Sequence, residues 1–205
     1  MKLRGLYAIT PDLDLSDRSK LRDKVQKALD GGVAALQYRS KNLEPWEALS
    51  ETKLYVSMCR TRGVPLIVND DISLAIAAGA DGVHIGKDDG DLAAARARIP
   101  GKILGASCYD SLDAARAAVA AGADYVAFGS VFASPTKPSA VRAPLALFAQ
   151  AKALGVPLVA IGGITLENAP QLLAAGADAL AVISDLFDAP DIAGRARAYG
   201  KLFQP

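Results

Sequence analysis

Ala78-Gly79-Ala80-Asp81-Gly82-Val83 is a phrase that the sequence repeats, as Ala121-Gly122-Ala123-Asp124-Tyr125-Val126 and as Ala175-Gly176-Ala177-Asp178-Ala179-Leu180. A looser variant is Leu29-Asp30-Gly31-Gly32-Val33-Ala34. In each phrase the glycine stands where a helix should end, because glycine adopts the left-handed conformation of a helix terminus at little cost. An apolar run follows each phrase. The repeat therefore predicts a helix, a tight turn and a strand in succession.

Short apolar runs along the chain are the predicted strands. They lack polar alternation, which is typical of strands that are covered on both faces of a parallel sheet. The eight runs are Leu6–Ile9, Ala34–Gln37, Leu66–Val68, Gly82–Ile85, Ile103–Gly105, Tyr125–Phe128, Leu158–Ile161 and Ala179–Ile183. Helical patterns lie between them, such as the alanine-rich stretches Leu92–Arg98 and Ala114–Ala121, since alanine is the best helix former. Proline in Val64-Pro65 and Val156-Pro157 marks the start of two strands.

Strands that alternate with helices indicate parallel pairing through right-handed crossovers. Eight such units predict the α/β class and a (β/α)8 TIM barrel, formed by residues 1–205 as a single compact domain. A chain of 205 residues lies near the lower limit of about 200 residues for this fold, so its loops must be short. A doubly wound open sheet is the alternative, but the fingerprint Gly-x-Gly-x-x-Gly is missing after the first strand.

Composition excludes several classes of protein. The chain has 23 Lys plus Arg and 22 Asp plus Glu, and this balance argues against a nucleic-acid partner. A hydrophobic content of 51% excludes disorder of the whole chain. No apolar run reaches the roughly 18–20 residues of a membrane-spanning helix, and Met1 to Tyr7 lack the apolar region of a signal peptide. Two cysteines, Cys59 and Cys108, make no disulfide framework and indicate a reducing, cytoplasmic location. The oligomeric state stays open, with a homo-oligomer among the possibilities.

Polar, charged and glycine residues follow the carboxyl ends of nearly all the predicted strands. In a parallel barrel these ends lie on one rim, where active sites of the fold are built. The segments are Gln37-Tyr38-Arg39-Ser40-Lys41, Asn69-Asp70-Asp71, His84 to Asp89, Ser107-Cys108-Tyr109, Gly129 to Pro138, Gly162-Gly163 and Ser184-Asp185. Loops are generally polar, but that does not account for arginine, lysine, asparagine and aspartate emerging directly from apolar strands.

The first chemistry that the rim predicts is phosphate binding. Gly162-Gly163-Ile164-Thr165 follows the seventh strand, and backbone N–H groups at bare glycines can wrap a phosphate. We expect Thr165 to cap a helix over 166–174, and Ser184 to supply further donors. The loops after strands seven and eight are the usual phosphate site of this barrel.

A magnesium site is the second prediction. Asp70 and Asp89 follow neighbouring strands, and oxygen ligands without clustered His or Cys suit Mg2+ rather than zinc. Arg39, Lys41 and Lys137 would neutralise the rest of a diphosphate. The other acidic residues nearby are interpreted as solvated turn residues, namely Asp71, Asp88 and Asp91.

Three further residues are assigned packing roles or no role. His84, the only histidine, lies inside an apolar strand and is interpreted as a hydrogen-bonded packing residue rather than a catalyst. Cys108 has no evident His partner that would activate a thiol, which argues against a nucleophile. Trp46 is expected to begin the second helix and to pack.

These residues resemble the thiamine-phosphate synthase family, a family of (β/α)8-barrel enzymes, along essentially the whole chain. The matching segments are Leu6 to Thr10, Gln37-x-Arg39-x-Lys41, Val68-Asn69-Asp70, Asp81 to Gly86 with Asp89, Ser107, Gly129 through Lys137, Ala160 to Ile164, and Val182-Ile183-Ser184. The chain departs from the family pattern at Lys87, where glutamine is frequent, at Ser130 and Ala133, where prolines are common, and at Ser134, which keeps the hydroxyl of a frequent threonine.

The resemblance implies that a hydroxymethylpyrimidine diphosphate is joined to a thiazole phosphate, or to its carboxylated precursor, with release of diphosphate. It implies Mg2+ at Asp70 and Asp89. The catalytic residues would be Arg39, Lys41, Ser107 and Lys137. The pyrimidine diphosphate would be held by Gln37, Tyr38, Arg39, Ser40, Lys41, Asn69, Ser107 and Lys137. The thiazole phosphate would be held by Ser134, Pro135, Thr136, Gly163, Ile183 and Ser184.

Two alternatives remain beside the synthase. A thiazole tautomerase shares the barrel but would need a proton-transfer residue, typically a histidine after strand five, where this chain has Ser107-Cys108-Tyr109. A non-catalytic binder of thiazole or thiamine phosphate would not need both the acidic pair and the diphosphate cations. Turnover with and without Mg2+ separates the three.

Overall fold

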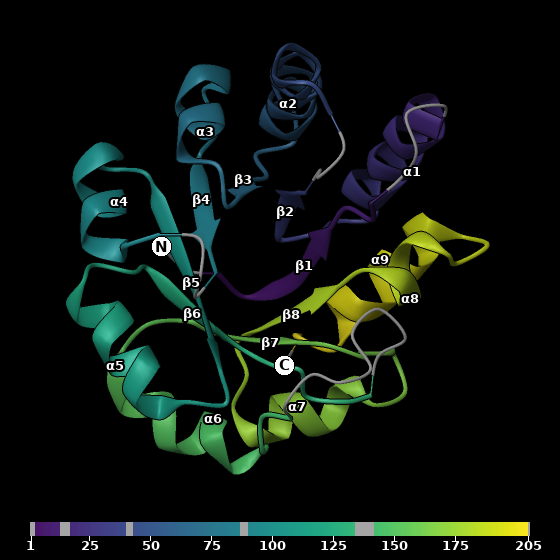
Figure 1. Cartoon of the computed structure of the whole chain (residues 1–205). Helices are drawn as coiled ribbons and strands as arrows, with labels where there is room; N and C mark the ends of the chain where they lie inside the picture. Colours follow the sequence, from purple (N-terminus) through teal and green to yellow (C-terminus); the bar gives the residue numbers. More distant parts are fainter. Residues whose placement is uncertain (1–2, 13–16, 40–42, 87–89, 134–141, 205) are drawn as a thin grey trace.

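The predicted apolar runs form strands that close on themselves. In the computed structural model, which describes residues 3–12, 17–39, 43–86, 90–133 and 142–204, eight parallel strands form a closed barrel in the order of the sequence (Figure 1). The strands are β1 (Gly5–Ile9), β2 (Ala35–Tyr38), β3 (Leu66–Asn69), β4 (Gly82–Ile85), β5 (Ile103–Tyr109), β6 (Tyr125–Phe128), β7 (Leu158–Ile161) and β8 (Ala179–Val182). The first and last strands pair in parallel, with Gly5 opposite Ala179, which completes the ring. The predicted barrel is therefore confirmed.

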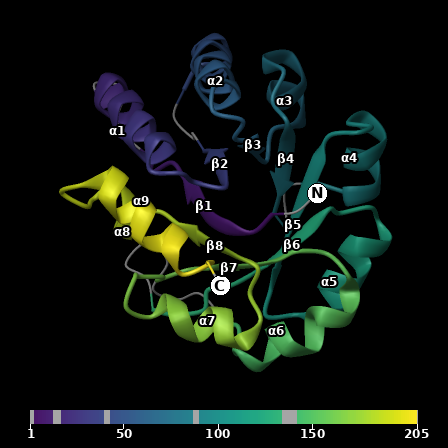
Figure 2. The ribbon, with the colours of Figure 1, turned by 180° about the vertical axis from the view of Figure 1, so that it is seen from behind.

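Helices cover the outside of the ring, as Figure 2 shows from behind. They are α1 (Arg18–Asp30), α2 (Pro45–Arg60), α3 (Ile72–Ala78), α4 (Leu92–Arg98), α5 (Leu112–Ala120), α6 (Ala146–Ala151) with a short 3-10 turn at Lys152–Leu154, α7 (Ala169–Ala175), α8 (Ser184–Phe187) and α9 (Ile192–Lys201). Two glycines of the repeated phrase, Gly79 and Gly176, are left-handed C-terminal caps as predicted, with φ of 71° and 109°. In the looser variant the cap Gly31 has a φ of −80°, so the left-handed conformation predicted there was wrong.

The aspartate of the repeated phrase ties neighbouring strands together at their amino-terminal ends. The backbone N–H of Leu66, the first residue of β3, donates to the Asp81 carboxylate at 2.8 Å. The N–H of Asp81 donates to the carbonyl of Leu66 at 2.9 Å. The same reciprocal pair joins Asp124 to Leu104 and Asp178 to Leu158. We call these three pairs the aspartate clasps, and they explain why the phrase carries an aspartate.

Side chains alternate between two apolar layers along the strands. The outer layer lies between strands and helices and includes Leu36, Val68 and Phe128. The inner layer fills the barrel, with Tyr7, Ile67, Tyr125 and other residues. Polar groups inside the barrel must be hydrogen-bonded to one another, because this layer excludes water.

Strand β5 is longer than the predicted Ile103–Gly105, since it continues to Tyr109 with a register irregularity between Ser107 and Tyr109. Ser107 therefore lies within a strand rather than after it. The prediction that Trp46 packs was wrong, because 71% of its surface is exposed. It begins α2 as expected, but it precedes the buried Tyr55 by nine positions. At 3.6 residues per turn, that spacing places it on the opposite side of the helix.

Candidate functional site

The carboxyl ends of all eight strands lie at one end of the closed parallel barrel, which we call the mouth. Arg39, Asn69, Asp70 and Gly163 follow or end strands there, as predicted. Several predicted site residues lie outside the described residues, namely Ser40, Lys41, Asp89, Ser134, Pro135, Thr136 and Lys137.

Arg39 is held at the mouth by the end of the first strand. Thr10, which is fully buried, accepts a hydrogen bond from the Arg39 backbone N–H at 2.9 Å and donates its hydroxyl to the Arg39 carbonyl at 3.2 Å. The guanidinium forms an ion pair with Asp12, and the arginine side chain is 22% exposed. Neither Thr10 nor Asp12 was predicted as part of the site. The sequence signal was their position directly after the first strand.

Asp70 has a strained backbone directly after β3. Its φ is +62°, a left-handed conformation that a non-glycine residue keeps only where its surroundings impose it. Its N–H donates to the carbonyl of His84 at 2.8 Å, and the Asn69 side-chain amide donates to its carboxylate. The turn thus places an oxygen ligand at the mouth, and this donor type suits Mg2+. Among the described ranges, which leave out Asp89, no group of three or more His, Cys, Asp or Glu is arranged to hold a metal.

Two neighbouring acidic residues that were interpreted as solvated turn residues are exposed, and they also cap helices, which was not predicted. Asp71 caps α3 by accepting from the Leu74 N–H at 2.8 Å. Asp91 caps α4 by accepting from the Ala94 N–H at 2.7 Å. Their carboxylates are therefore engaged with helix ends, while the predicted Asp88 lies outside the described residues.

The glycine pair after β7 forms a tight turn against the segment after β6. Gly162 and Gly163 have φ of +103° and +63°. A Cβ on Gly163 would collide with the carbonyl oxygen of Ala133, and the Phe132 N–H donates to the Gly162 carbonyl at 3.1 Å. Only glycine fits so close a backbone approach. The segment predicted to bind phosphate is therefore a tight turn at the mouth, formed by two residues without side chains.

The helix after this turn begins later than predicted. Instead of a helix over 166–174, α7 begins at Ala169. Before the helix begins, Thr165 and Asn168 are joined by a hydrogen bond, which the Thr165 N–H donates to the Asn168 side-chain oxygen at 2.9 Å. The Asn168 amide also donates to the Gly163 carbonyl at 3.0 Å. This side chain therefore fixes the glycine turn, a role that the sequence analysis did not assign.

Ile183 and Ser184 lie beside the glycine turn, because β7 and β8 are paired neighbours. Ile183 packs against the inner apolar layer. Ser184 is the first residue of α8 and is exposed. The adjacent Asp185 accepts from Arg195 at 2.8 Å and from the Tyr199 hydroxyl at 2.7 Å, which anchors this end of α8 to α9.

Gln37 and Ser107 are joined through the barrel interior by hydrogen bonds. The Gln37 amide donates to the Tyr7 hydroxyl at 2.9 Å, and the Tyr7 and Tyr125 hydroxyls are 2.8 Å apart. His84 is 3.0 Å from the Tyr125 hydroxyl through Nδ1 and 2.9 Å from the Ser107 hydroxyl through Nε2. His84 is thus a hydrogen-bonded buried residue, as predicted. Tyr7 and Tyr125 were missed, although two phenols in otherwise apolar strands were the available signal.

Tyr38 does not face the barrel interior. It is 3% exposed and belongs to the outer apolar layer, with its ring centroid 5.1 Å from that of Tyr55 on α2. Because successive side chains of a strand point to opposite faces, Tyr38 faces the helices while Gln37 faces the interior. That Tyr38 holds the pyrimidine diphosphate stays a prediction, and its side chain points away from the barrel interior.

Cys108 is unsuited to act as a nucleophile. The side chain is 1% exposed, and burial raises the pKa of its thiol to about 12. The reactive thiolate is therefore scarce near neutral pH. The prediction that Cys108 is not a nucleophile is consistent with this burial.

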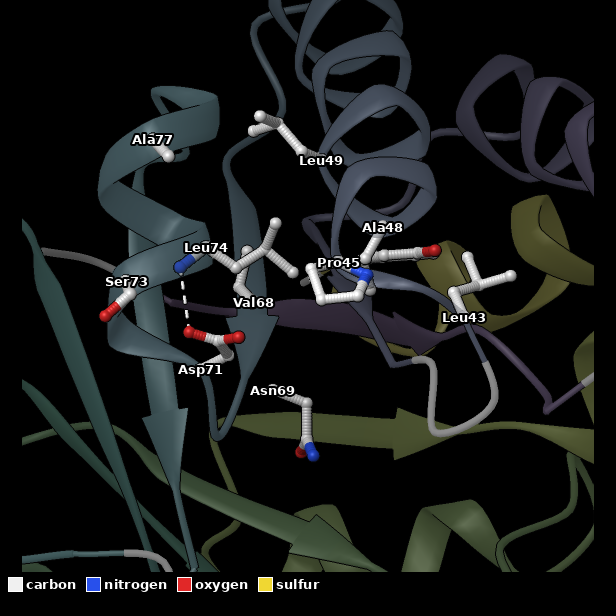
Figure 3. Close-up of a pocket in the computed structure, with 11 residues that line it drawn as sticks. Leu43, Pro45, Ala48, Leu49, Val68, Asn69, Asp71, Ser73, Leu74 and Ala77 are labelled. Atoms are coloured by element: carbon white, nitrogen blue, oxygen red, sulfur yellow. Dashed lines mark hydrogen bonds between the residues drawn. The ribbon is translucent and has the colours of Figure 1, made fainter.

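A groove of about 370 Å³ lies outside the barrel, between α2 and α3 (Figure 3). Leu43, Pro45, Leu49 and Leu74 supply much of its apolar wall, and Asn69 lies at the end nearest the mouth.

Of the helices in the described ranges, none combines the length and apolar character that a bilayer crossing requires.

The fold is that of a (β/α)8-barrel enzyme, and the arginine, the aspartate beside an asparagine and the glycine turn lie at the end of the barrel where active sites of this fold are built. Residues 6–186 match the family described as thiamine monophosphate synthase. The chain belongs to this family.

Curated relatives agree with this assignment over almost the whole chain. The thiamine-phosphate synthase of Aromatoleum aromaticum is 56% identical over 204 residues, covering 98% of this chain and 97% of the relative. That of Methylobacillus flagellatus is 54% identical, covering 98% and 96%. Among solved structures, a thiamine phosphate pyrophosphorylase from Pyrococcus furiosus has a TM-score of 0.86 at 35% identity, covering 98% of this chain and 95% of the other.

Proposed function

We propose that this barrel joins 4-amino-2-methyl-5-hydroxymethylpyrimidine diphosphate to 4-methyl-5-(2-phosphoethyl)thiazole, or to its carboxylated form, giving thiamine phosphate and diphosphate. With the carboxylated form, carbon dioxide is released as well. The family membership supports an alkyl-transferring synthase. The single structural observation that carries the proposal is the convergence of Arg39, Asp70 and Gly163 on one barrel mouth. A reaction with one diphosphate and one monophosphate partner needs two anion-binding regions within reach of each other.

The diphosphate end of the site is assigned to the rim after β2 to β5. Arg39 can bind phosphate oxygens through two N–H groups, and Ser107 and Asn69 offer further polar contacts. Lys41 and Lys137 would add positive charge. Their charges would stabilise the departing diphosphate as its negative charge grows.

Mg2+ is the cofactor that fits the residues at the end of β3. Asp70 supplies a carboxylate at the mouth, and Asp89 is the second proposed ligand. When bound, the ion would neutralise diphosphate oxygens and stabilise the leaving group. Few protein ligands are needed, because Mg2+ keeps waters and binds substrate phosphates.

The thiazole phosphate is assigned to the rim after β6 to β8. The backbone of Gly163 lies at this part of the rim, after β7. Ile183 and Ser184 follow the neighbouring strand β8. The remaining proposed contacts are Ser134, Pro135 and Thr136. Anchoring the phosphate would orient the thiazole nitrogen toward the pyrimidine methylene carbon.

The proposed chemistry breaks one carbon–oxygen bond and forms one carbon–nitrogen bond. The aminopyrimidine stabilises positive charge on its exocyclic methylene as diphosphate leaves with the bonding electrons. The nitrogen lone pair of the thiazole then forms the new bond. With the aromatic thiazole no general base is required, which agrees with a mouth that has no accessible histidine or cysteine among the described residues.

The residues at the carboxyl end of β5 do not favour a tautomerase. Such an enzyme would need a proton-transfer residue at this position. Cys108 is buried with a raised pKa, and the only histidine of the chain, His84, is 7% exposed. The synthase is therefore the function that the site supports best.

Location and partners are part of the same proposal. Both cysteines are free and buried, which supports a reducing compartment, and we assign the protein to the cytoplasm. Its partners are two small-molecule substrates.

Substitution of the two proposed Mg2+ ligands provides the test. We expect Asp70→Ala and Asp89→Ala to lower Mg2+-dependent diphosphate release at least a hundredfold, because an ion that neutralises the leaving group is lost. Binding of the thiazole phosphate, measured by calorimetry, should be unchanged in both variants. The measurement is diphosphate release with purified substrates at several Mg2+ concentrations.

Asp71→Ala is the matched control. It removes the neighbouring carboxylate, which caps a helix, and should lower stability by about 1 kcal/mol while turnover stays within twofold. Full turnover in Asp70→Ala and Asp89→Ala would remove the metal site from the proposal. Absence of product in the wild-type protein with both substrates and Mg2+ would overturn the function.

A further inference from the structure

Five side chains cross the barrel interior in one unbroken series of hydrogen bonds. The series runs from Gln37 on β2 through Tyr7, Tyr125 and His84 to Ser107 on β5, with heavy-atom distances of 2.9, 2.8, 3.0 and 2.9 Å. The three central side chains are at most 7% exposed. The two ends of the series are residues that the proposed function assigns to the pyrimidine diphosphate, while the three central residues have been given no role in it.

The direction of each hydrogen bond in this series is determined by its Gln37 end. The Gln37 amide nitrogen donates to Tyr7, so the single Tyr7 proton is directed to Tyr125. The Tyr125 proton is in turn directed to Nδ1 of His84. A neutral imidazole that accepts at Nδ1 carries its proton on Nε2 and donates there to Ser107. The hydroxyl proton of Ser107 is then directed away from His84.

Ring packing holds the central residues in this arrangement. The Tyr7 and Tyr125 rings meet edge to face, with centroids 5.9 Å apart at 84°. The His84 and Tyr125 rings are stacked, with centroids 5.6 Å apart. Burial raises the pKa of both phenols, so each keeps the proton that the series needs. Buried, fully bonded polar groups of this kind have few alternative arrangements.

We propose that Tyr7, Tyr125 and His84 are positioning residues, which fix Gln37 with its amide oxygen as an acceptor and Ser107 with its hydroxyl as a donor. The inference rests on the proposed function. An acceptor suits the exocyclic amino group of an aminopyrimidine, and a hydroxyl donor suits a diphosphate oxygen. The reversed series would present an amide donor and a hydroxyl acceptor, which match neither group. Among the described residues, none donates a hydrogen bond to the Gln37 amide oxygen.

The first test reads the state of His84 directly, because it is the only histidine in the chain. In protein labelled with 15N-histidine, nitrogen NMR at pH 8 assigns the ring proton to one nitrogen. The expected result is a neutral ring with the proton on Nε2. A proton on Nδ1 would overturn the proposal, and this readout does not depend on turnover.

The second test removes one hydroxyl from the series and keeps its ring. In Tyr125→Phe, His84 loses the donor to Nδ1, so we expect a mixture of the two tautomers. We also expect kcat/KM for the pyrimidine diphosphate to fall about tenfold, the effect of one buried hydrogen bond. KM for the thiazole phosphate should not change. Tyr7→Phe, which breaks the series next to Gln37, should reduce kcat/KM for the same substrate and serves if Tyr125→Phe does not fold.

Tyr55→Phe is the matched control. Tyr55 is equally buried, but it lies in the outer layer, and its hydroxyl has no hydrogen-bond partner among the described residues. Its His84 tautomer and kinetics should equal those of the wild type. If the wild type turns over and both series variants behave like Tyr55→Phe, the positioning role is refuted while the synthase function stands. If the wild type releases no diphosphate, the function fails and the role in catalysis fails with it, whatever the tautomer.

Discussion

At the scale of single residues, the positions directly after strands are the ones that could be predicted from the sequence. Arg39, Asn69, Asp70 and Gly163 follow or end strands in a parallel barrel, so topology alone brings them to one mouth. The outward direction of the Tyr38 side chain could have been predicted by the same reasoning. Strand β2 continues to Tyr38, and the two-residue period of a strand directs its side chain outward.

Partners within the site could not be predicted in this way. The ion pair of Arg39 with Asp12 and the bond of Asn168 to Gly163 depend on side-chain directions in loops. Loop side chains have no periodicity that a sequence displays. The series of hydrogen bonds from Gln37 to Ser107 could not be predicted for another reason. It joins five different strands, and their side chains meet only in the closed barrel.

Gly163 gives the residue-scale prediction. Gly163→Ala should lower the free energy of unfolding by at least about 1–2 kcal/mol, because the cost of a left-handed non-glycine residue adds to the collision with the Ala133 carbonyl. It should also raise KM for the thiazole phosphate about tenfold, because the new Cβ displaces the Ala133 carbonyl. KM for the pyrimidine diphosphate should change less than twofold. Urea denaturation and steady-state kinetics measure both effects.

The control for this variant is Gly155→Ala. Gly155 has a similar φ of +71°, and a Cβ there meets nothing within 4 Å. It should lose about 1–2 kcal/mol from the left-handed conformation alone, less than Gly163→Ala, with unchanged kinetics. Equal KM values for the thiazole phosphate in the two variants would show that the glycine turn does not take part in thiazole binding.

At the scale of helices and strands, the types of element were predictable and some of their ends were not. The alanine-rich stretch over 92–98 is α4 with the predicted bounds. Strand β5 was predicted too short, because its polar Ser107 faces the interior and bonds His84. Helix α7 was predicted too long, because Thr165 and Asn168 form a turn in place of the first helical turn. Both errors arise where polar side chains bond locally.

The aspartate clasps give the prediction at this scale. Asp81→Ala removes the acceptor for the Leu66 N–H at the buried start of β3, and should lower the free energy of unfolding by about 1–2 kcal/mol. Asp81→Asn keeps an acceptor oxygen and should remain within about 0.5 kcal/mol of the wild type. Urea denaturation compares the three proteins. Both variants should keep wild-type kcat and KM, because the clasp lies at the end of the barrel opposite the mouth.

An equal loss of stability in Asp81→Asn would show that charge, rather than the hydrogen bond, is what the aspartate contributes. Altered kinetics in a folded Asp81→Ala protein would contradict the separation of the clasp from the mouth.

At the scale of the whole molecule, alternation of apolar runs and helical patterns was sufficient to predict the closed barrel. The inner layer was not predictable in detail, because it forms only when all eight strands meet. Folding also buries weakly acidic groups in both the outer and the inner layer. Burial raises the pKa of the Cys59 and Cys108 thiols to about 12. It also raises the pKa of four phenols, those of Tyr7, Tyr55, Tyr125 and Tyr199.

These shifts predict a loss of stability in alkali. Between the unfolded thiol pKa of roughly 8.5 and about 12, the unfolded chain has released its thiol protons while the native protein retains them. The free energy of unfolding therefore falls as pH rises, by up to about 1.4 kcal/mol per pH unit for each thiol. Urea denaturation at pH 8, 9 and 10 measures the slope. The double variant Cys59→Ala/Cys108→Ala starts less stable but should show a shallower slope, and a slope equal to that of the wild type would refute the assignment to the thiols.

The aspartate clasps also bear on how such a scaffold can evolve. They join neighbouring strands at the amino-terminal end of the barrel through the aspartates of a short repeated phrase, and they involve no residue of the mouth. Mutations that change the loops of the mouth therefore leave the aspartate clasps intact. A protein that keeps the clasps can therefore acquire a different reaction while it keeps the barrel. The loops of the mouth can likewise be engineered while the amino-terminal end of the barrel stays unchanged.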